Sequence, residues 1–273
     1  MFCPDESSRT KAGQHSVTQN YCLSMETYER TLETTTDDGD MVVVITEPTS
    51  SPPAGVDDWP TVLWFFDLPG LRPAVRDGMA RLASEGYRVV TPDLHHRHGR
   101  LLFKEPKDMG QPGAREEMVG WLDAMTDDEI QHDGARALDA AGLATDSQYM
   151  AIGFCLGTRA VYKAIEADSD RVLAGACFHP SLMATDDEGS PHHTAAGLSR
   201  PMYLGIGEED QVQSIAMHQR FLDAVEPLPH VEVITFPGAD HAFTWPGYPT
   251  YDETAAETSW AKSLALFAAA LTT

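Results

Sequence analysis

A strand that turns directly into a helix constrains the fold of this chain more than any other feature. The segment "QYMAIGF", residues 148–154, has the composition of a buried strand, and "LGTRAVYKAIEA", residues 156–167, has the spacing of a helix. Cys155 lies between them, in a G-x-C-x-G pattern with Gly153 and Gly157. A connection this short requires glycine on both sides, because larger side chains would collide with the neighbouring backbone. The segment therefore predicts a strand, a sharp turn and a helix.

Strands and helices alternate along most of the chain. Further strands are predicted at 61–67, 88–94, 171–180, 201–207 and 231–237, and further helices at 72–87, 126–143, 211–225 and 252–271. Thr126 and Glu129 form a capping box at the start of one of these helices. Residues 26–48 read as a hairpin around Asp38 and Gly39. We therefore expect an α/β fold: a mostly parallel central sheet with helices on both faces and an N-terminal antiparallel hairpin.

The length of the chain sets the expected domain organisation. A chain of 273 residues is long enough for one large sheet to bury a continuous core. Residues 1–24 show no hydrophobic periodicity and are expected to form an irregular N-terminal tail. Residues 25–273 are expected to form a single domain.

Charge excludes two classes of partner. The chain has 42 Asp and Glu residues against 19 Lys and Arg, a formal net charge of -23. Such a surface repels nucleic acid and anionic lipid, so neither is expected to bind. No stretch approaches the length of a membrane span. We expect a small molecule as the partner, with either a monomer or a small homo-oligomer as the assembly.

The cysteines and histidines predict no metal site. The four cysteines are irregularly spaced and form no C-x-x-C, which argues against a zinc site or a disulfide framework and favours reduced thiols in the cytoplasm. The histidine clusters at 95–98 and 192–193 have no carboxylate or cysteine partners at ligand spacing, so we expect solvated loops there.

Cys155 is a candidate nucleophile. The predicted turn lifts its side chain above the edge of the sheet, and the N-terminus of the following helix favours a thiolate there. A thiol needs a base within hydrogen-bond reach and a third group to orient that base. His241 follows the last predicted strand and Asp210 follows the one before, in the order nucleophile, acid, histidine. Cys177 has no such context and is expected to be structural.

Some of these roles have competing candidates. Glu208 and Glu209 compete with Asp210, while Asp240 and His218 are lesser alternatives. The oxyanion that forms during acyl transfer would accept hydrogen bonds from two backbone N–H groups. We assign these to Leu156, directly after the cysteine, and to Leu68 in the loop after residues 61–67.

Four ordered motifs resemble the dienelactone hydrolase family of α/β-hydrolases. They are "FFDLPGL" followed by "GYRVVTPDL", then "GFCLG", "GEED" and "FPGADHAF", and the resemblance covers roughly residues 28–272. It implies the α/β-hydrolase fold and a cofactor-free hydrolase that acts on lactones or small esters. With Cys155 as the nucleophile, the acyl intermediate would be a thioester.

The resemblance also implies roles around the pocket. Asp67 stands where the best-known members of the family carry a glutamate that contacts the resting cysteine and releases it when an anionic substrate binds. Trp245 replaces one of the two arginines that hold the substrate carboxylate in those members, and we expect its ring at the mouth of the pocket. Arg115 is the candidate for the other arginine. His179 ends a strand on the same edge of the sheet and is a candidate to line the pocket.

Two other functions stay open from the sequence. One is a broad carboxylesterase or thioesterase with the same three residues and a pocket for neutral substrates. A dienelactonase needs a cationic clamp instead, which Arg115, Arg97 or Arg100 would have to supply. The other is a non-catalytic protein that binds a small molecule or senses oxidants through Cys155.

Overall fold

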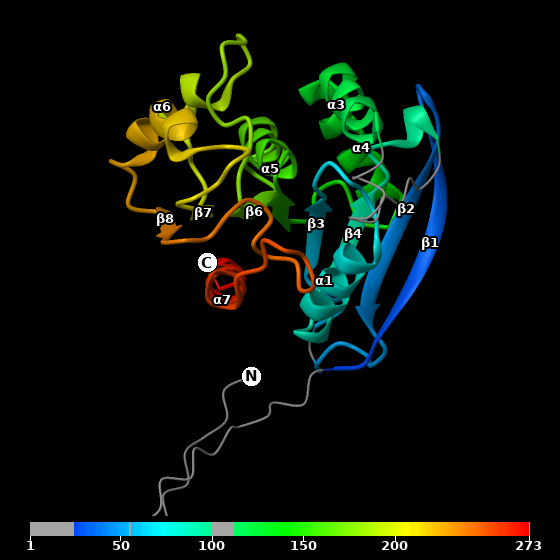
Figure 1. The fold of residues 1–273 in the computed structure, drawn as a ribbon. Coiled ribbons are helices and arrows are strands. Elements are labelled where there is room, and N and C mark those ends of the chain that lie inside the picture. Colours follow the sequence, from blue (N-terminus) through cyan, green and yellow to red (C-terminus); the bar gives the residue numbers. More distant parts are fainter. Residues whose placement is uncertain (1–24, 55, 100–111, 273) are drawn as a thin grey trace, which may run out of the picture.

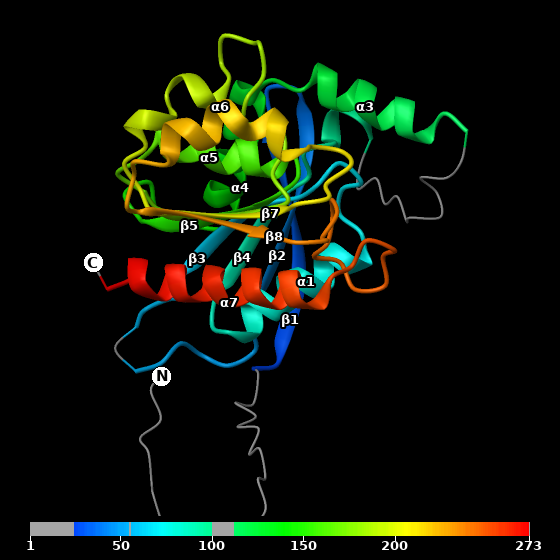
Figure 2. The ribbon, with the colours of Figure 1, turned by 60° about the vertical axis from the view of Figure 1, so that its left-hand side comes forward.

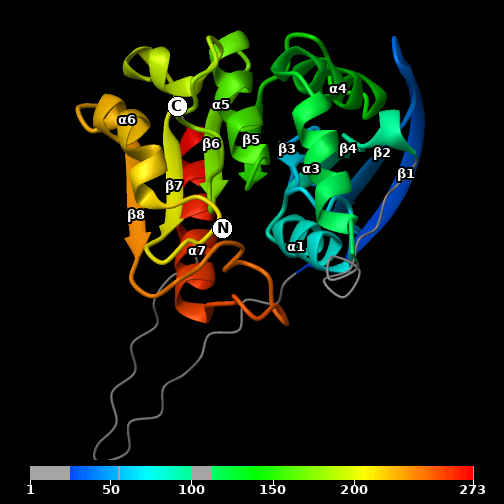
Figure 3. The same cartoon turned by 45° about the horizontal axis from the view of Figure 1, so that its top comes forward.

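The central element of the structure is one eight-stranded sheet. The structure, a computed structural model, describes residues 25–54, 56–99 and 112–272 (Figure 1). Its strands follow the spatial order β1-β2-β4-β3-β5-β6-β7-β8, which can be followed across Figure 3. The strands are β1 (Thr27–Thr36), β2 (Gly39–Pro48), β3 (Thr61–Phe65), β4 (Arg88–Pro92), β5 (Tyr149–Phe154), β6 (Val172–Phe178), β7 (Met202–Gly207) and β8 (Val231–Phe236). The predicted tail over residues 1–24 lies outside the described residues.

Helices cover both faces of this sheet. The α-helices are α1 (Pro73–Ser84), α3 (Ala114–Ala124), α4 (Asp127–Ala140), α5 (Gly157–Ala167), α6 (Ile215–Val225) and α7 (Glu253–Ala270). The 3₁₀ turns are η1 (His96–His98), η2 (Pro191–His193) and η3 (Ala195–Gly197). Figure 2 shows α1 and α7 on one face and α4, α5 and α6 on the other. No helix in the described ranges is both long and apolar enough to cross a membrane.

Strand directions confirm the predicted fold class. The pairs from β4 through β3, β5, β6 and β7 to β8 are parallel, while β1 pairs with β2, and β2 with β4, antiparallel. The hairpin turn lies one residue earlier than predicted, because Thr36 pairs with Gly39 and leaves Asp37 and Asp38 in the loop. Gly39 has a φ of 124°, which glycine adopts without the steric cost of a Cβ.

Two helical boundaries differ from the sequence prediction. The helix predicted from residue 211 begins at Ile215, because the Asp210 carboxylate accepts hydrogen bonds from the N–H groups of Val212 and Gln213 and holds them in a turn. Helix α3 was not predicted, and it lies in the long segment before the Thr126 capping box. The capping box itself is confirmed at the start of α4.

A stack of aromatic rings supports the turn after β5. Trp64 of β3 stacks on Phe154 of β5 at 4.6 Å between ring centroids, and Phe154 stacks on Phe178 of β6 at 4.8 Å. All three side chains are fully buried. Because Phe154 immediately precedes Cys155, this packing fixes the end of β5 where the cysteine leaves the sheet.

The turn at Cys155 has the strained geometry that its glycines predict. Cys155 adopts a φ of 53°, a left-handed conformation that costs energy for a residue with a Cβ. A Cβ on Gly153 would lie 2.2 Å from the carbonyl oxygen of Gly157, and one on Gly157 would lie 2.3 Å from that of Phe65. Neither position has room for a side chain. The two glycines therefore permit the tight turn that places Cys155 at the carboxyl edge of the sheet.

Candidate active site

Cys155 lies at the junction of β5 and α5, partly accessible to solvent. Its backbone N–H donates to the carbonyl oxygen of Phe178 at 3.1 Å, which ties the turn to β6. Its Sγ lies 3.3 Å from the Oγ of Ser181, in the connection after β6. The sulfur stands at the N-terminus of α5, where the helix dipole stabilises negative charge.

His241 and Asp210 lie close together at the carboxyl edge of the sheet, in the loops after β8 and β7. The Nδ1 of His241 lies 2.7 Å from the Oδ2 of Asp210, so Nδ1 carries a proton and donates a hydrogen bond to the carboxylate. Asp210 is fully buried at its side chain, whereas Glu208 and Glu209 are exposed. Among the predicted acids, Asp210 is therefore the partner of His241.

Asp240 and His218, the two lesser alternatives from the sequence, lie outside the pair of His241 and Asp210. Asp240 accepts hydrogen bonds from the backbone N–H groups of Gln211 and His241, so it joins the loop after β7 to the loop after β8. His218, on α6, is buried beside the pair, and burial lowers its pKa.

The electrostatics of His241 favour the imidazolium. Burial lowers the pKa of His241, but the nearby Cys155 sulfur and the hydrogen bond to Asp210 outweigh it and raise the pKa to about 10. Within the described part of the chain, the Nε2 of His241 has no hydrogen-bond partner. The arrangement can therefore pair a charged imidazolium with a thiolate.

The two predicted oxyanion donors lie in short, restrained segments. Leu156 begins the turn into α5, and Leu68 follows β3. The Nε2–H of His95 donates to the Leu68 carbonyl at 3.0 Å, and burial lowers the pKa of His95 to about 4, which keeps this ring neutral near pH 7. Neither leucine N–H donates to another protein group among the described residues. Both donors are thus available to an oxyanion.

Asp67 makes different contacts from those that the resemblance implies. Its carboxylate forms a bidentate pair with Arg72, with Nη2 to Oδ2 at 2.7 Å, and accepts a hydrogen bond from the Trp245 indole at 2.9 Å. No hydrogen bond joins Asp67 to Cys155 among the described residues, and the sulfur contacts Ser181 instead. The contact with the resting cysteine that the resemblance implies is therefore absent from the described structure. Two functional candidates, Arg72 and Ser181, were not found from the sequence.

Of the three arginines that could supply a cationic clamp, Arg97 alone has a described side chain. Arg97 forms a bidentate pair with Asp133 and also bonds Asp38, beside the hairpin. The backbone of Arg115 belongs to α3, but its side chain lies outside the described residues, as does Arg100. Among the described residues, the Arg72 guanidinium lies near two site residues, because its charge acts on His179 and it packs on the Trp245 ring. Burial opposes its charge, and the Asp67 carboxylate outweighs this and raises the pKa of Arg72.

His179 and Trp245 are buried walls of the site. The His179 ring lies 4.9 Å from that of His241, edge to face, and its side chain is fully buried. Burial and the charge of His241 lower its pKa well below the usual value. Trp245 was expected at the mouth of the pocket, but it is 1% exposed because its ring packs against Phe154 and the Arg72 guanidinium.

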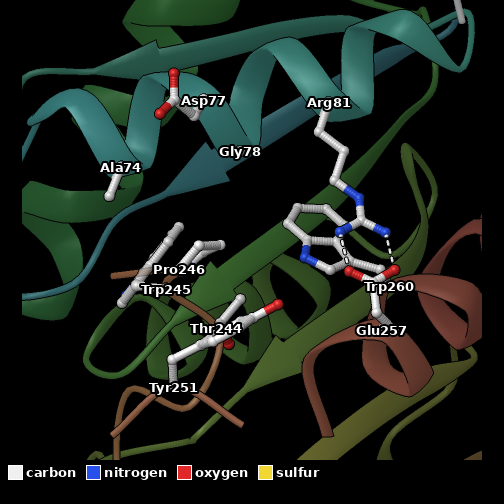
Figure 4. Close-up of a pocket in the computed structure, with 10 residues that line it drawn as sticks. All are labelled: Ala74, Asp77, Gly78, Arg81, Thr244, Trp245, Pro246, Tyr251, Glu257 and Trp260. Atoms are coloured by element: carbon white, nitrogen blue, oxygen red, sulfur yellow. Dashed lines mark hydrogen bonds and ion pairs between the residues drawn. The ribbon is translucent and has the colours of Figure 1, made fainter. Parts of the chain in front are cut away.

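A cavity of about 210 Å³ lies beside Trp245, away from the cysteine. Figure 4 shows it between Ala74 and Gly78 of α1 and the loop that carries Trp245, with the Arg81–Glu257 ion pair at one end. Cys155, His241 and Asp210 do not line it.

The described ranges contain no cluster of three or more His, Cys, Asp or Glu side chains suited to a metal ion. Of the four cysteines, Cys155 and Cys177 are free, and the other two lie outside those ranges.

Known proteins resemble the chain in both sequence and structure. The model of the dienelactone hydrolase family matches residues 44–271. A carboxymethylenebutenolidase of Rhodococcus opacus is 27% identical over 221 residues, covering 78% of this chain and 82% of that protein. A Salmonella typhi protein provisionally named carboxymethylenebutenolidase is 27% identical over 217 residues, covering 77% of each.

A solved structure has the same architecture. A protein of Klebsiella pneumoniae subsp. pneumoniae MGH 78578, provisionally named dienelactone hydrolase, superimposes with a TM-score of 0.74 at 22% identity. The match covers 89% of this chain and 98% of that one. Because the family model spans most of the sequence, the chain is a hydrolase that belongs to the dienelactone hydrolase family.

Proposed function

We propose that this protein opens lactones or cleaves small carboxylic esters, with Cys155 as nucleophile, His241 as base and Asp210 as the residue that orients the base. The hydrogen bond of 2.7 Å between His241 Nδ1 and Asp210 Oδ2 carries this proposal. It fixes the tautomer that leaves Nε2 for the thiol, at the edge of the sheet where the turn presents Cys155. A cysteine used only for packing or oxidant sensing would not need an oriented base.

The proposed reaction proceeds in two stages. The Cys155 thiolate attacks the carbonyl carbon, and the N–H groups of Leu156 and Leu68 stabilise the oxyanion. His241, as the imidazolium, donates its Nε2 proton to the departing alkoxide as the C–O bond breaks, which leaves a thioester on Cys155. His241 then takes a proton from water, and the resulting hydroxide attacks the thioester. The C–S bond breaks to give the carboxylic acid and the Cys155 thiolate, and the acid releases its proton to solvent and leaves as the carboxylate.

The contacts of Arg72 favour a substrate without a carboxylate. Its Nη1 and Nη2 donate to Asp67, Nη1 also donates to the Gly70 carbonyl, and Nε donates to the Tyr248 hydroxyl at 2.5 Å. The Arg72 side chain is 1% exposed. An anionic substrate would have to displace Asp67 from a buried ion pair, which is costly. We therefore favour neutral esters and lactones over an anionic dienelactone.

A substrate comparison tests this proposal. We expect purified wild-type protein to hydrolyse neutral p-nitrophenyl esters or simple lactones with kcat/KM at least about tenfold above that for cis-dienelactone, since an unmatched charge costs more than 1.4 kcal/mol. A His241→Gln variant is the control for turnover that needs the base. Preference for cis-dienelactone would contradict the neutral pocket, and no turnover of any ester or lactone would contradict the hydrolase proposal.

The charge of Asp210 predicts a change in pH dependence. Because the raised pKa of His241 keeps the imidazolium present up to about pH 10, kcat/KM of the wild type should fall as the pH rises through that value. The negative charge of Asp210 and its hydrogen bond both favour the imidazolium. Asp210→Asn removes the charge and weakens the hydrogen bond. The alkaline limb should then move to lower pH by about one to three units. A limb unchanged in Asp210→Asn would show that Asp210 does not tune the base.

A further inference from the structure

The Ser181 hydroxyl lies directly against the proposed nucleophile. Its Oγ is 3.3 Å from the Cys155 Sγ, within hydrogen-bond range for sulfur. Ser181 is 4% exposed, so solvent competes little for this contact. The contact joins residues 26 positions apart, from the turn after β5 and the connection after β6.

A network of hydrogen bonds holds Ser181 in this place. Its backbone N–H donates both to the Cys155 carbonyl and to the Oγ1 of Thr158, each at 3.1 Å. The Thr158 hydroxyl in turn donates to the Cys155 carbonyl at 2.6 Å. The flanking residues His179 and Leu182 have φ values of 39° and 61°, so this segment is bent into an unfavourable backbone conformation beside the sulfur.

The hydrogen-bond chemistry of the pair depends on the state of the sulfur. A thiolate has no proton to give, so next to a thiolate the Ser181 hydroxyl is the donor and the sulfur the acceptor. Hydrogen bonds to a charged acceptor are stronger than those between neutral groups. Removing the hydroxyl therefore destabilises the thiolate more than the thiol, and a smaller fraction of the sulfur is thiolate at a given pH.

We infer that Ser181 is a catalytic residue that donates a hydrogen bond to the Cys155 thiolate, and that it holds the sulfur at rest in place of the acidic side chain after β3. The inference rests on the proposed function of Cys155 as nucleophile. Asp67 is held by Arg72 and Trp245, so it is committed elsewhere. Ser181 and His241 then stabilise the thiolate together.

Other charged and titratable groups lie around the sulfur. The Asp67–Arg72 pair follows β3, His95 follows β4, and His179 follows β6. Asp210 follows β7, His241 follows β8, and His218 lies on α6. Burial lowers the pKa values of His95, His179 and His218, so these rings are neutral near pH 7. The Asp67–Arg72 pair carries no net charge. Because the charge of these rings and of the ion pair does not change near pH 7, a change in Cys155 reactivity in a Ser181 variant can be attributed to the hydroxyl.

The test is the pH dependence of thiol alkylation. The rate of iodoacetamide reaction at Cys155, followed by mass spectrometry of the peptide that contains it, reports the thiolate fraction without any substrate. In Ser181→Ala the midpoint of the acid limb should rise by about one pH unit, and the rate below the midpoint should fall about tenfold. Ser181→Thr keeps a hydroxyl and should retain the wild-type midpoint.

Controls separate this role from a structural one. Ser190→Ala removes another buried serine hydroxyl, in the same connection, that contacts His192 and not the sulfur, and it should leave the midpoint unchanged. Thermal unfolding establishes that each variant is folded. A wild-type midpoint in Ser181→Ala, or equal shifts in Ser181→Ala and Ser181→Thr, would overturn the inference. Because alkylation needs no ester, a shifted midpoint without ester hydrolysis would overturn the proposed function alone.

Discussion

Replacing Cys155 with alanine is expected to lower kcat/KM for a neutral ester by about 10⁴-fold or more, equivalent to about 5.5 kcal/mol of transition-state stabilisation. The variant loses the only atom that can form the acyl intermediate in the proposed reaction, while His241 and Asp210 remain in place. The side chain is partly exposed, and alanine is smaller, so the fold should tolerate the change. Steady-state kinetics on purified protein measure the effect.

Cys155→Ser is the informative companion. A hydroxyl retains the size of the side chain, but its proton is far harder to remove than that of a thiol, so the ion pair with His241 is lost. We expect hydrolysis well below the wild type in this variant as well. If folded Cys155→Ala and Cys155→Ser both hydrolysed the ester at the wild-type rate, Cys155 would not be the nucleophile. A wild-type rate in Cys155→Ser alone would contradict the need for the thiolate.

Breaking the ion pair between Asp67 and Arg72 is expected to cost about 3–5 kcal/mol of unfolding free energy. The side chains of Arg72 and Asp67 are 1% and 4% exposed. Arg72→Leu leaves the Asp67 carboxylate buried with the Trp245 indole as its remaining described donor. A buried charge without its ionic partner carries a desolvation penalty that this one hydrogen bond offsets only in part. Urea unfolding of the variant and the wild type measures the difference.

The chain supplies a matched control for this change. Arg81 forms a bidentate pair with Glu257 in the same geometry, at 2.7 Å for both contacts, but these side chains are 38% and 52% exposed. Arg81→Leu should cost no more than about 1 kcal/mol, because solvent screens exposed pairs. Equal costs for Arg72→Leu and Arg81→Leu would contradict the account of a sealed ion pair. Replacing both Asp67 and Arg72 with leucine should recover much of the loss, since no charge is then left unpaired.

The fold was predictable because local signals and chain order agreed. The apolar strands and the glycines around Cys155 indicate a parallel sheet, and the Thr126 capping box marks a helix boundary that the structure confirms. The missing helix was α3, in which Ala114 and Met118 are the buried residues among the described side chains, too few to give a clear apolar periodicity. Helix α6 started late because the side chain of Asp210 competes for the backbone N–H groups that a helix would use.

The candidate site was predictable only in part. Cys155, Asp210 and His241 follow the parallel strands β5, β7 and β8, and parallel strands bring their carboxyl ends to one edge. The contacts of Arg72 and Ser181 depend on side-chain packing between segments distant in sequence, which no periodicity encodes. Arginine is mostly exposed in proteins, so nothing in "DLPGLR" marks Arg72 as buried. The contacts of Asp67 and the burial of Trp245 were not predicted for the same reason, because their partners were unknown.

The most direct test of the proposed mechanism is to trap the acyl-enzyme. Wild-type protein mixed with an activated neutral ester and quenched in acid within its first turnovers should gain the mass of one acyl group on the peptide that contains Cys155. Hydroxylamine should release it, as expected for a thioester, and Cys155→Ala should show no such label. An acyl group on another residue of the wild type, or rapid hydrolysis in a protein whose Cys155 is blocked by alkylation, would contradict Cys155 as the nucleophile.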